Sequence, residues 1–216
     1  MKSLCASLAV ALTLILTSCG DAPSQFPPGL APLAPDTAPE PTPVAGDKTP
    51  ERLSTVSDSG GDYDEAFARG YIHAPIATVF AALQEPPTVI DRRNVDAFTI
   101  TKNVEPGYEV SFRVHNVVHD IVTVTFDITW REGVVAGSKS APQVVAARAA
   151  KTAGTSYISL LEVSVVLTAV SDSVTRVELV EQIQSATDSA DTIEQYLKDL
   201  YASLLAKSHG HPLPTY

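Results

Sequence analysis

The chain has 216 residues, of which 44% are hydrophobic and 19% charged, enough for one domain with a sizeable core and short flanking segments. It carries 15 Lys and Arg against 25 Asp and Glu, a formal net charge of −10 without a basic cluster, so nucleic-acid binding is not expected. Both cysteines, Cys5 and Cys19, lie in the first twenty residues. The rest of the chain therefore has no disulfide framework, thiolate zinc site or cysteine nucleophile.

The first residues have the pattern of an export signal. Lys2 supplies one positive charge, and a mostly apolar run of 13 residues follows over Leu4–Leu16. This run is shorter than the roughly 20 helical residues that a span of the hydrocarbon core needs. We therefore expect a leader peptide over residues 1–18 and no transmembrane anchor.

The end of this leader resembles the lipobox of bacterial lipoproteins, with the residues Leu16-Thr17-Ser18-Cys19. The resemblance implies cleavage before Cys19 and acylation of its thiol, so that two or three acyl chains hold the protein on a membrane. A cleaved leader without lipid is the alternative. Gly20 stands where lipoproteins retained in the inner membrane carry Asp, which favours the outer membrane of the cell envelope in a two-membrane bacterium.

A proline-rich segment follows. Residues 21–50 hold nine of the 16 prolines and a single aromatic residue, Phe26, and residues 51–60 remain polar. Such a composition favours extended, solvated chain at about 3.1 Å per residue. We expect residues 19–60 to form a disordered tether, with a ligand for a proline-recognition domain as the alternative, followed by a folded domain over 61–208 and a tail over 209–216.

The folded domain is predicted to begin with a strand that leads directly into a helix. Glu65–His73 has strand composition, and Pro75 then precedes a helix in which Ile76, Val79, Phe80 and Leu83 share one face. The two prolines at 86 and 87 end this helix. A second short helical turn is predicted over residues 88–93, and extended chain over residues 98–101.

Alternating runs of apolar and polar residues predict antiparallel strands in the middle of the chain. Apolar residues alternate with polar ones from Tyr108 to Val114 and from Val122 to Trp130, with Val110, Phe112, Val124 and Phe126 on the inward faces. Further strands are predicted over residues 144–151, 157–169 and 176–183. Turns are predicted at Pro106-Gly107, Glu132-Gly133, Ala153-Gly154 and Ser171-Asp172-Ser173.

The last predicted element is an amphipathic helix over Asp191–Lys207, ended by Gly210 and Pro212. Asp191 and Glu194 have the spacing of a capping box. An apolar stripe follows the helix at spacings of three and four residues, comprising Ile193, Tyr196, Leu197, Leu200, Tyr201, Leu204 and Leu205. Because the apolar face of the sheet needs a cover, we expect an α+β fold in which six to seven curved strands wrap around this helix, with two short helices after strand 1.

This order of elements resembles the START-like, or polyketide-cyclase-like, helix-grip superfamily (SRPBCC). The resemblance rests on the strand-to-helix step at Ile72-His73-Ala74-Pro75 within residues 68–83, on Trp130 at the end of a long strand, and on the C-terminal helix. It implies a cavity between the sheet and that helix which takes lipids, sterols, polyketides or other apolar molecules. Some members of the superfamily are enzymes, and many only bind.

Cavity candidates follow from the inward faces and the helix stripe. The expected lining residues are Val110, Phe112, Val124, Phe126, Trp130, Val163, Val165, Leu197 and Leu200. Phe112 and Trp130 can equally serve as core residues, because cavities and cores draw on the same residue types. The sequence lacks the glycine-flanked serine elbow, the zinc-helix motif, the P-loop and the Rossmann fingerprint, and we expect no cofactor, metal ion or catalytic residue.

Several polar residues deserve weaker hypotheses. His115 and His119, with Asp120 beside them, could bind a metal ion, but their spacing favours a polar outer face or a hairpin tip, and His209 and His211 belong to a frayed tail. The alternation places Asp127 and Glu162 outside the grip. The pair at 92 and 93, both Arg, is expected at the solvated end of a short helix, with contact to an anionic ligand as the alternative.

Three classes of function remain open. The first is a non-catalytic module, tethered to the membrane through Cys19, that binds an apolar small molecule or lipid. The second is an envelope scaffold with a filled core, and the third is a cyclase-like enzyme, which requires convergent polar groups that the predicted inward residues do not supply. A cavity of a few hundred cubic ångströms under the last helix favours the first. We expect a monomer.

Overall fold

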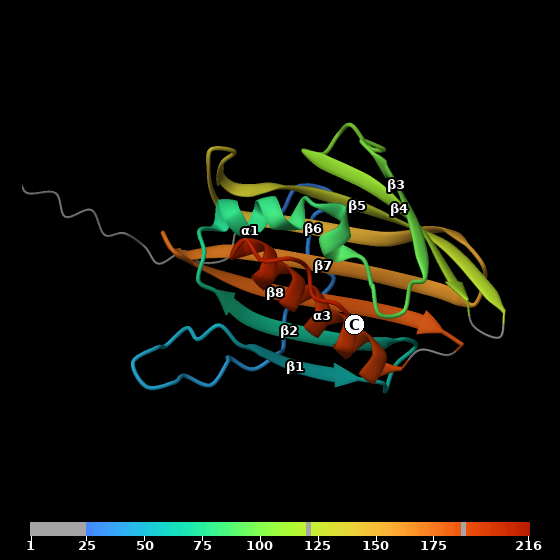
Figure 1. Cartoon of the computed structure of the whole chain (residues 1–216), viewed down its shortest axis with the longest axis horizontal. Helices are drawn as coiled ribbons and strands as arrows, with labels where there is room; N and C mark the ends of the chain where they lie inside the picture. Colours follow the sequence, from blue (N-terminus) through green and yellow to red (C-terminus); the bar gives the residue numbers. More distant parts are fainter. Residues whose placement is uncertain (1–24, 120–121, 187–188) are drawn as a thin grey trace, which may run out of the picture.

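The computed structural model describes residues 25–119, 122–186 and 189–216, and its strands form one antiparallel sheet. Eight strands lie in the order β1-β2-β8-β7-β6-β5-β4-β3 across this curved sheet (Figure 1). Their bounds are Leu53–Asp58 (β1), Asp64–Ile72 (β2), Ala97–Lys102 (β3), Val110–His119 (β4), Thr123–Ser138 (β5), Ala141–Gly154 (β6), Ile158–Ser171 (β7) and Val174–Ser185 (β8). The predicted α+β architecture is confirmed, with eight strands in place of six or seven.

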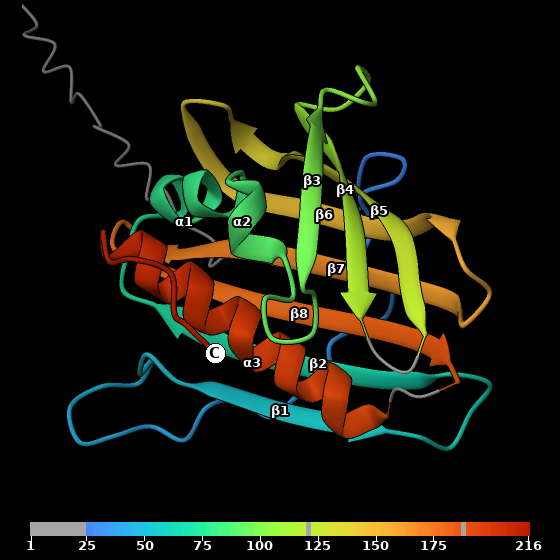
Figure 2. The same ribbon diagram turned by 45° about the vertical axis from the view of Figure 1, so that its right-hand side comes forward.

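Three helices cover the concave face of the sheet (Figure 2). Helices α1 (Ile76–Leu83) and α2 (Pro86–Val89) follow β2, as expected, and α1 packs on β6, β7 and α3. Helix α3 (Ala190–Ser208) lies along β1, β2 and β8. Its buried apolar residues are Ala190, Ile193, Tyr196, Leu197, Leu200, Tyr201 and Leu204. The predicted clasp of one sheet around one terminal helix is therefore confirmed.

A glycine in β2 lets α3 approach the sheet closely. A Cβ atom on Gly70 would lie 2.7 Å from the carbonyl oxygen of Arg52 and 2.9 Å from Cε2 of Tyr201. Both distances are shorter than side chains tolerate, so only glycine fits between the start of β1 and this helix. The Tyr201 hydroxyl then donates a hydrogen bond to the backbone oxygen of Tyr71 at 2.6 Å, which fixes the helix against β2.

Two predictions about the strands were wrong. The polar sequence at Leu53–Asp58 was assigned to the tether but forms the edge strand β1, in which Thr55 and Ser57 donate to the Glu194 carboxylate on α3 at 2.8 and 2.9 Å. The turn predicted at Glu132-Gly133 lies inside β5, which continues to pair with β6 up to Ser138. In both cases the pairing strand and helix supply partners that composition does not reveal.

Smaller differences concern helix and turn boundaries. The turn predicted at Ala153-Gly154 falls after β6 instead, and α2 begins two residues before the helical turn predicted over residues 88–93 and ends within it. The predicted capping box is absent, because Ser189 occupies the N-cap of α3 without a side-chain cap, and the Glu194 carboxylate is held by β1 and by Lys198 at 2.6 Å. The interaction of a residue with another element outweighs its local capping tendency here.

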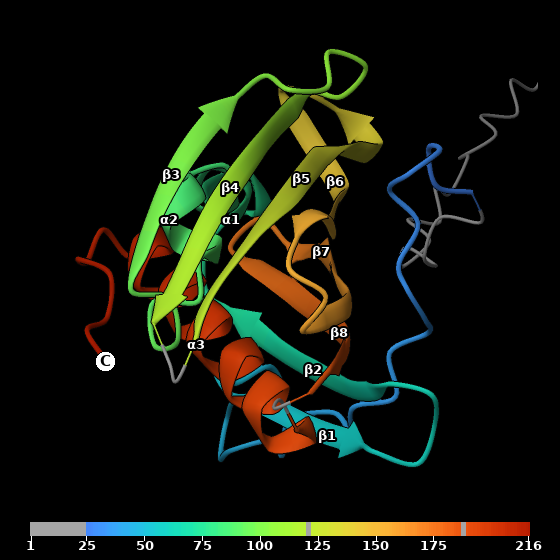
Figure 3. The same ribbon diagram turned by 90° about the vertical axis from the view of Figure 1, so that its right-hand side faces the viewer.

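The segment before β1 differs from the expected disordered tether over the residues that are described. We call residues 25–52 the N-terminal strap, and its residues 31–40 run along the convex face of the sheet, opposite α3 (Figure 3). Asp36 accepts from Arg69 Nε at 2.8 Å, Glu40 accepts from the Tyr71 hydroxyl at 2.7 Å, and Ala38 is buried. Proline-rich chain cannot join the sheet but can pack small apolar residues and acceptors against it.

The C-terminal tail also differs from the expectation that it frays and leaves the arginine pair solvated. Arg93 forms two hydrogen bonds with Asp199 on α3, at 2.7 and 3.0 Å, and its guanidinium lies 4.5 Å from the ring centroid of Tyr216. Arg92 donates to Ser203 at 2.8 Å and to the backbone oxygen of Pro214. Both arginines therefore fix the chain after α2 and the tail to α3.

Candidate ligand-binding cavity

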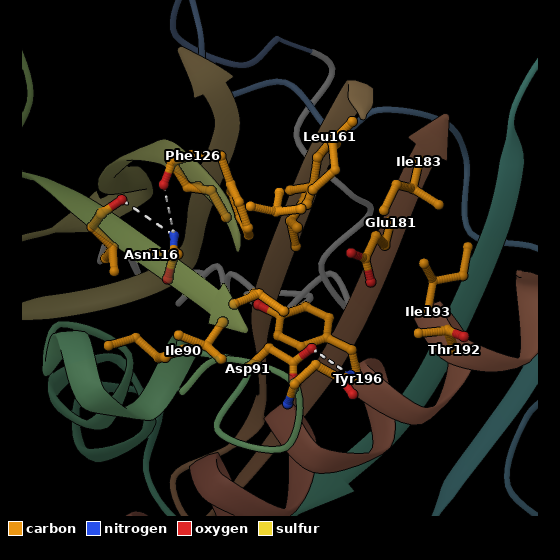
Figure 4. Close-up of a pocket in the computed structure, with 18 of the residues that line it drawn as sticks. Ile90, Asp91, Asn116, Phe126, Leu161, Glu181, Ile183, Thr192, Ile193 and Tyr196 are labelled. Atoms are coloured by element: carbon orange, nitrogen blue, oxygen red, sulfur yellow. Dashed lines mark hydrogen bonds between the residues drawn. The ribbon is translucent and has the colours of Figure 1, made fainter. Parts of the chain in front are cut away.

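A cavity of about 370 Å³ lies between the sheet and the N-terminal half of α3. Its wall is formed by strands β4, β5, β7 and β8, by the chain from Val89 to Val95, and by Thr192, Ile193 and Tyr196 of α3 (Figure 4). Val122 and Tyr157 are exposed, Thr192 is half-buried, and all three belong to the wall, so they mark its mouth. The volume falls in the range of small-molecule pockets.

The apolar wall comes from alternate residues of neighbouring strands. Val114 and Ile128 pair across β4 and β5, and Leu161 and Ile183 pair across β7 and β8, so their side chains share the concave face. Four of the residues expected to line a cavity are on this wall: Val124, Phe126, Trp130 and Val163. Their contact with a ligand stays a prediction.

The other five expected residues are not on the wall. Val110, Phe112, Val165, Leu197 and Leu200 lie at the opposite end of the concave face, where side chains fill the interior. There Phe112 stacks on Trp130, with ring centroids 6.2 Å apart and an interplanar angle of 13°. Trp130 thus separates two parts of the concave face. We call the part around the cavity the hollow region and the part around Phe112 the filled region. Alternation predicted which way these residues point but not which of them meet empty space.

Polar residues reach the cavity from three elements, and the sequence analysis missed them. Asn116 continues the inward alternation of Phe112 and Val114 on β4, and Glu181 lies between inward residues on β8. Figure 4 shows the Glu181 carboxylate pointing into the cavity. The alternation was a usable signal, since continuing it by one inward position on either strand reaches a polar residue. The inward residues named from the sequence supply no polar group, and the structure adds these polar residues to them.

Hydrogen bonds within the protein hold these polar groups in place. Asp91 accepts from the backbone amides of Arg93 and Asn94 at 3.1 and 3.2 Å and from Asn94 Nδ2 at 2.8 Å. Tyr196 donates its hydroxyl proton to the backbone oxygen of Val89 at 2.9 Å. These bonds fix the chain between α2 and β3 as one wall of the cavity, so the site is formed before any ligand arrives.

Burial perturbs the ionisation of the groups on the wall. Desolvation raises the pKa of Asp91, although the hydrogen bonds from Asn94 and Arg93 oppose it. Desolvation also raises the pKa of Tyr196 well above its ordinary value, and the charges of Glu181 and Asp91 act in the same direction. Both carboxylates therefore act on the same phenol, which places the negative potential of the cavity on this side.

A second acid is buried in the filled region. Glu132 on β5 is 0% exposed and follows Trp130 on the inward face, and neither of its carboxylate oxygens has a hydrogen-bond partner among the described residues. Burial raises the pKa of Glu132 to about 8. This residue is not on the cavity wall. It was assigned to a turn from sequence, so its burial was not foreseen.

The remaining hypotheses concern residues outside the cavity. His115 Nδ1 lies 2.6 Å from Asp127 Oδ1 on the convex face, and Glu162 lies 3.4 Å from Arg148, so the carboxylates are outside the grip as predicted. Among the described residues, no cluster of His, Cys, Asp or Glu could hold a metal ion. Asp120 and the lipobox with Cys19 lie outside the described residues. No helix in the described part of the chain is long and apolar enough to span a membrane.

Comparison with known proteins relates the chain through its fold alone. No protein-family model and no curated protein matches the sequence. The structure is similar to the lipid transfer and protein localization domain of human StarD13, with a TM-score of 0.50, 8% identity, and coverage of 76% of this chain and 85% of that one. Human StAR-related lipid transfer protein 5 gives a TM-score of 0.52, 10% identity and the same coverages. The chain has the helix-grip fold of START-type domains.

Proposed function

We propose that this chain is a non-catalytic binding module that takes up an apolar small molecule or lipid in a bacterial cell envelope. The observation that carries the proposal is the cavity of about 370 Å³ under α3, with a largely apolar wall and a few fixed polar groups. The fold supports it, because structures of the same fold are described as lipid transfer domains. The scaffold hypothesis requires an interior that is filled throughout, so the cavity favours the binding function over it.

The polar groups on the wall are better suited to recognition than to catalysis. The Tyr196 proton is donated to Val89, and Asp91 is held by three hydrogen bonds, so neither is poised beside a nucleophile. Among the described wall residues there is no histidine, cysteine or lysine. A cyclase-like activity would need one of these carboxyl groups to exchange protons with the bound molecule.

The binding test uses the full chain with Cys19→Ser, purified without detergent and extracted with organic solvent for mass spectrometry. We expect a small set of apolar molecules in near-stoichiometric amount. The matched control is the same chain with Val163→Phe, which places a larger side chain in the cavity and should lose the extracted molecules. Repeated preparations without any apolar molecule, or equal recovery from the control, would contradict the proposal.

We further propose that lipid on Cys19 anchors the module, with the outer membrane favoured by Gly20. The proposal rests on the Leu16-Thr17-Ser18-Cys19 sequence. In a two-membrane bacterium that produces the chain, the wild-type protein should sediment with the outer membrane, and Cys19→Ser should move it to the soluble fraction. Cys5→Ser is the matched control, because that cysteine precedes the predicted cleavage site. Equal sedimentation of all three proteins would contradict the anchor.

A further inference from the structure

The charges on the cavity wall all have one sign. Asp91 and Glu181 are its charged residues, and none of the described wall residues is lysine, arginine or histidine. The nearest arginines in sequence, Arg92 and Arg93, are turned toward α3 and the C-terminal tail. A bound anion would therefore meet two acidic side chains in a poorly solvated space, and the described wall residues offer it no cation.

The amide and phenol donors away from the mouth of the cavity are used within the protein, whereas Tyr157 adds a hydroxyl at the mouth. Asn116 Nδ2 donates to the backbone oxygens of Val114 and Phe126 at 3.3 and 3.4 Å, and Asn94 Nδ2 donates to Asp91. The Tyr196 hydroxyl donates to Val89. What these groups present to the cavity is acceptor capacity: carboxylate oxygens, the phenolic oxygen and the amide oxygen of Asn116.

The amide of Asn116 gives an independent indication of the same preference. Its residue is 2% exposed and lies on the cavity wall, and among the described residues none donates to its Oδ1. This amide oxygen can therefore accept a hydrogen bond from a ligand in the cavity. Asn116 comes from β4, whereas Glu181 comes from β8 and Asp91 from the chain after α2, so the acceptors surround the cavity.

We infer that the cavity selects an apolar molecule that carries a hydrogen-bond donor, a hydroxyl or an amine, and rejects amphiphiles with an anionic head. This inference rests on the proposed binding function and narrows its ligand class. We therefore expect the cavity not to bind fatty acids or phosphate-bearing lipids, because their head groups are anionic. The hydroxyl or amine of the ligand donates a hydrogen bond to Asp91, Glu181 or Asn116. The hydrocarbon chain or ring system of the ligand contacts the apolar wall of β5 and β7.

The test uses three probes with the same ten-carbon chain: decan-1-ol, decylamine and decanoate. The chain has one tryptophan, Trp130, and it lies on the cavity wall, so its fluorescence reports binding in the full chain with Cys19→Ser. At pH 7 the alcohol or the amine should bind at least about tenfold more tightly than decanoate. Tighter binding of the amine than of the alcohol would show that the cavity prefers a cationic head group. Equal affinity for the two would show that it recognises a hydrogen-bond donor whatever its charge.

Variants connect the preference to the cavity. Glu181→Gln should weaken amine binding and improve decanoate binding, and Asp91→Asn provides a second variant at another part of the wall. The matched control is Glu162→Gln, which changes the net charge equally on the convex face of β7 and should leave the ratio unchanged. Decanoate binding as tight as the alcohol and amine, or an equal effect of the control, would overturn the inference while leaving the binding function intact. No fluorescence response to any probe would overturn both.

Discussion

The concave face of the sheet has two regions that are built from similar residues but packed differently. In the filled region, Phe112 stacks on Trp130, and the buried residues of α1 and of the C-terminal half of α3 complete the core. In the hollow region, valines on β4, β5 and β7 face Ile193 and Tyr196 of α3 across about 370 Å³ of empty space. The filled region has the stacked rings and the cover of α1, whereas the valines of the hollow region are too short to reach across the curved sheet.

The comparison shows that an apolar inward face does not by itself define a core. In the filled region the side chains make dispersion contacts with one another, so truncating them lowers the free energy of unfolding. The hollow region lacks those contacts and leaves space for a ligand. Each region also holds an acid: Asp91 on the cavity wall is half-buried and hydrogen-bonded, whereas Glu132 in the filled region is buried and has no hydrogen-bond partner among the described residues. Variants can test this division.

Truncation of Phe112 should produce the largest loss of stability. Phe112→Ala removes a ring that is stacked on Trp130 and 1% exposed, and should lower the free energy of unfolding by about 3–5 kcal/mol. Phe126→Ala removes a ring that already faces the cavity, and should cost about 1–2 kcal/mol less because fewer packing contacts are lost. Urea unfolding of both variants measures the difference. Equal losses would show that the two regions are packed alike.

Removal of the buried acid should stabilise the filled region. The pKa of Glu132 is about 8 in the folded protein, against an ordinary value of 4.5. The folded state therefore retains a proton that the unfolded state releases, and stability falls as the pH rises from 4.5 to 8 and changes no further above it. At about 1.4 kcal/mol per pKa unit, this costs a few kcal/mol.

Glu132→Leu should therefore raise the free energy of unfolding more at pH 8.5 than at pH 5. Glu132→Gln is the matched control: it removes the titration but retains a buried polar group, so it should flatten the pH dependence with a smaller gain. Urea unfolding across this pH range is the measurement. If the wild type and Glu132→Leu show the same pH dependence of stability between pH 5 and 8.5, Glu132 is solvated or paired in solution.

Enlarging one residue on β7 should separate stability from binding. Val165→Phe adds a ring to the filled region and should destabilise the protein by about 1–3 kcal/mol. Val163→Phe, two residues away on the same face, places the ring in the cavity, and should abolish the response of Trp130 to decan-1-ol with little loss of stability. If both variants lose similar stability and both retain binding, the cavity is not the binding site.

The smallest effect is expected at the boundary between α3 and the chain after α2. Tyr196→Phe removes the hydrogen bond to the backbone oxygen of Val89 and should cost about 1 kcal/mol, since it leaves a carbonyl without that donor. Backbone amides from Val89 to Val95 should then exchange hydrogen faster, while those of β2 and β8 keep their protection. Unchanged exchange after Val89 would show that this bond does not hold the wall.

The sequence determined the elements and the direction of their side chains. Period-two alternation predicted that Phe126, Trp130 and Val163 face inward, and the period of three to four residues predicted the buried stripe of α3. These patterns are local, so they can be read without the fold. Continuing them would have found Asn116 and Glu181.

Only the tertiary structure decided where the interior is empty, because a void depends on the distance between side chains from strands that lie far apart in sequence. It also placed Glu132 inside, where pairing with β6 extends β5 through an expected turn, and it set the proline-rich strap on the convex face, where Asp36 meets Arg69. Local composition favours a turn and a free tether in these places, and long-range pairing outweighs it.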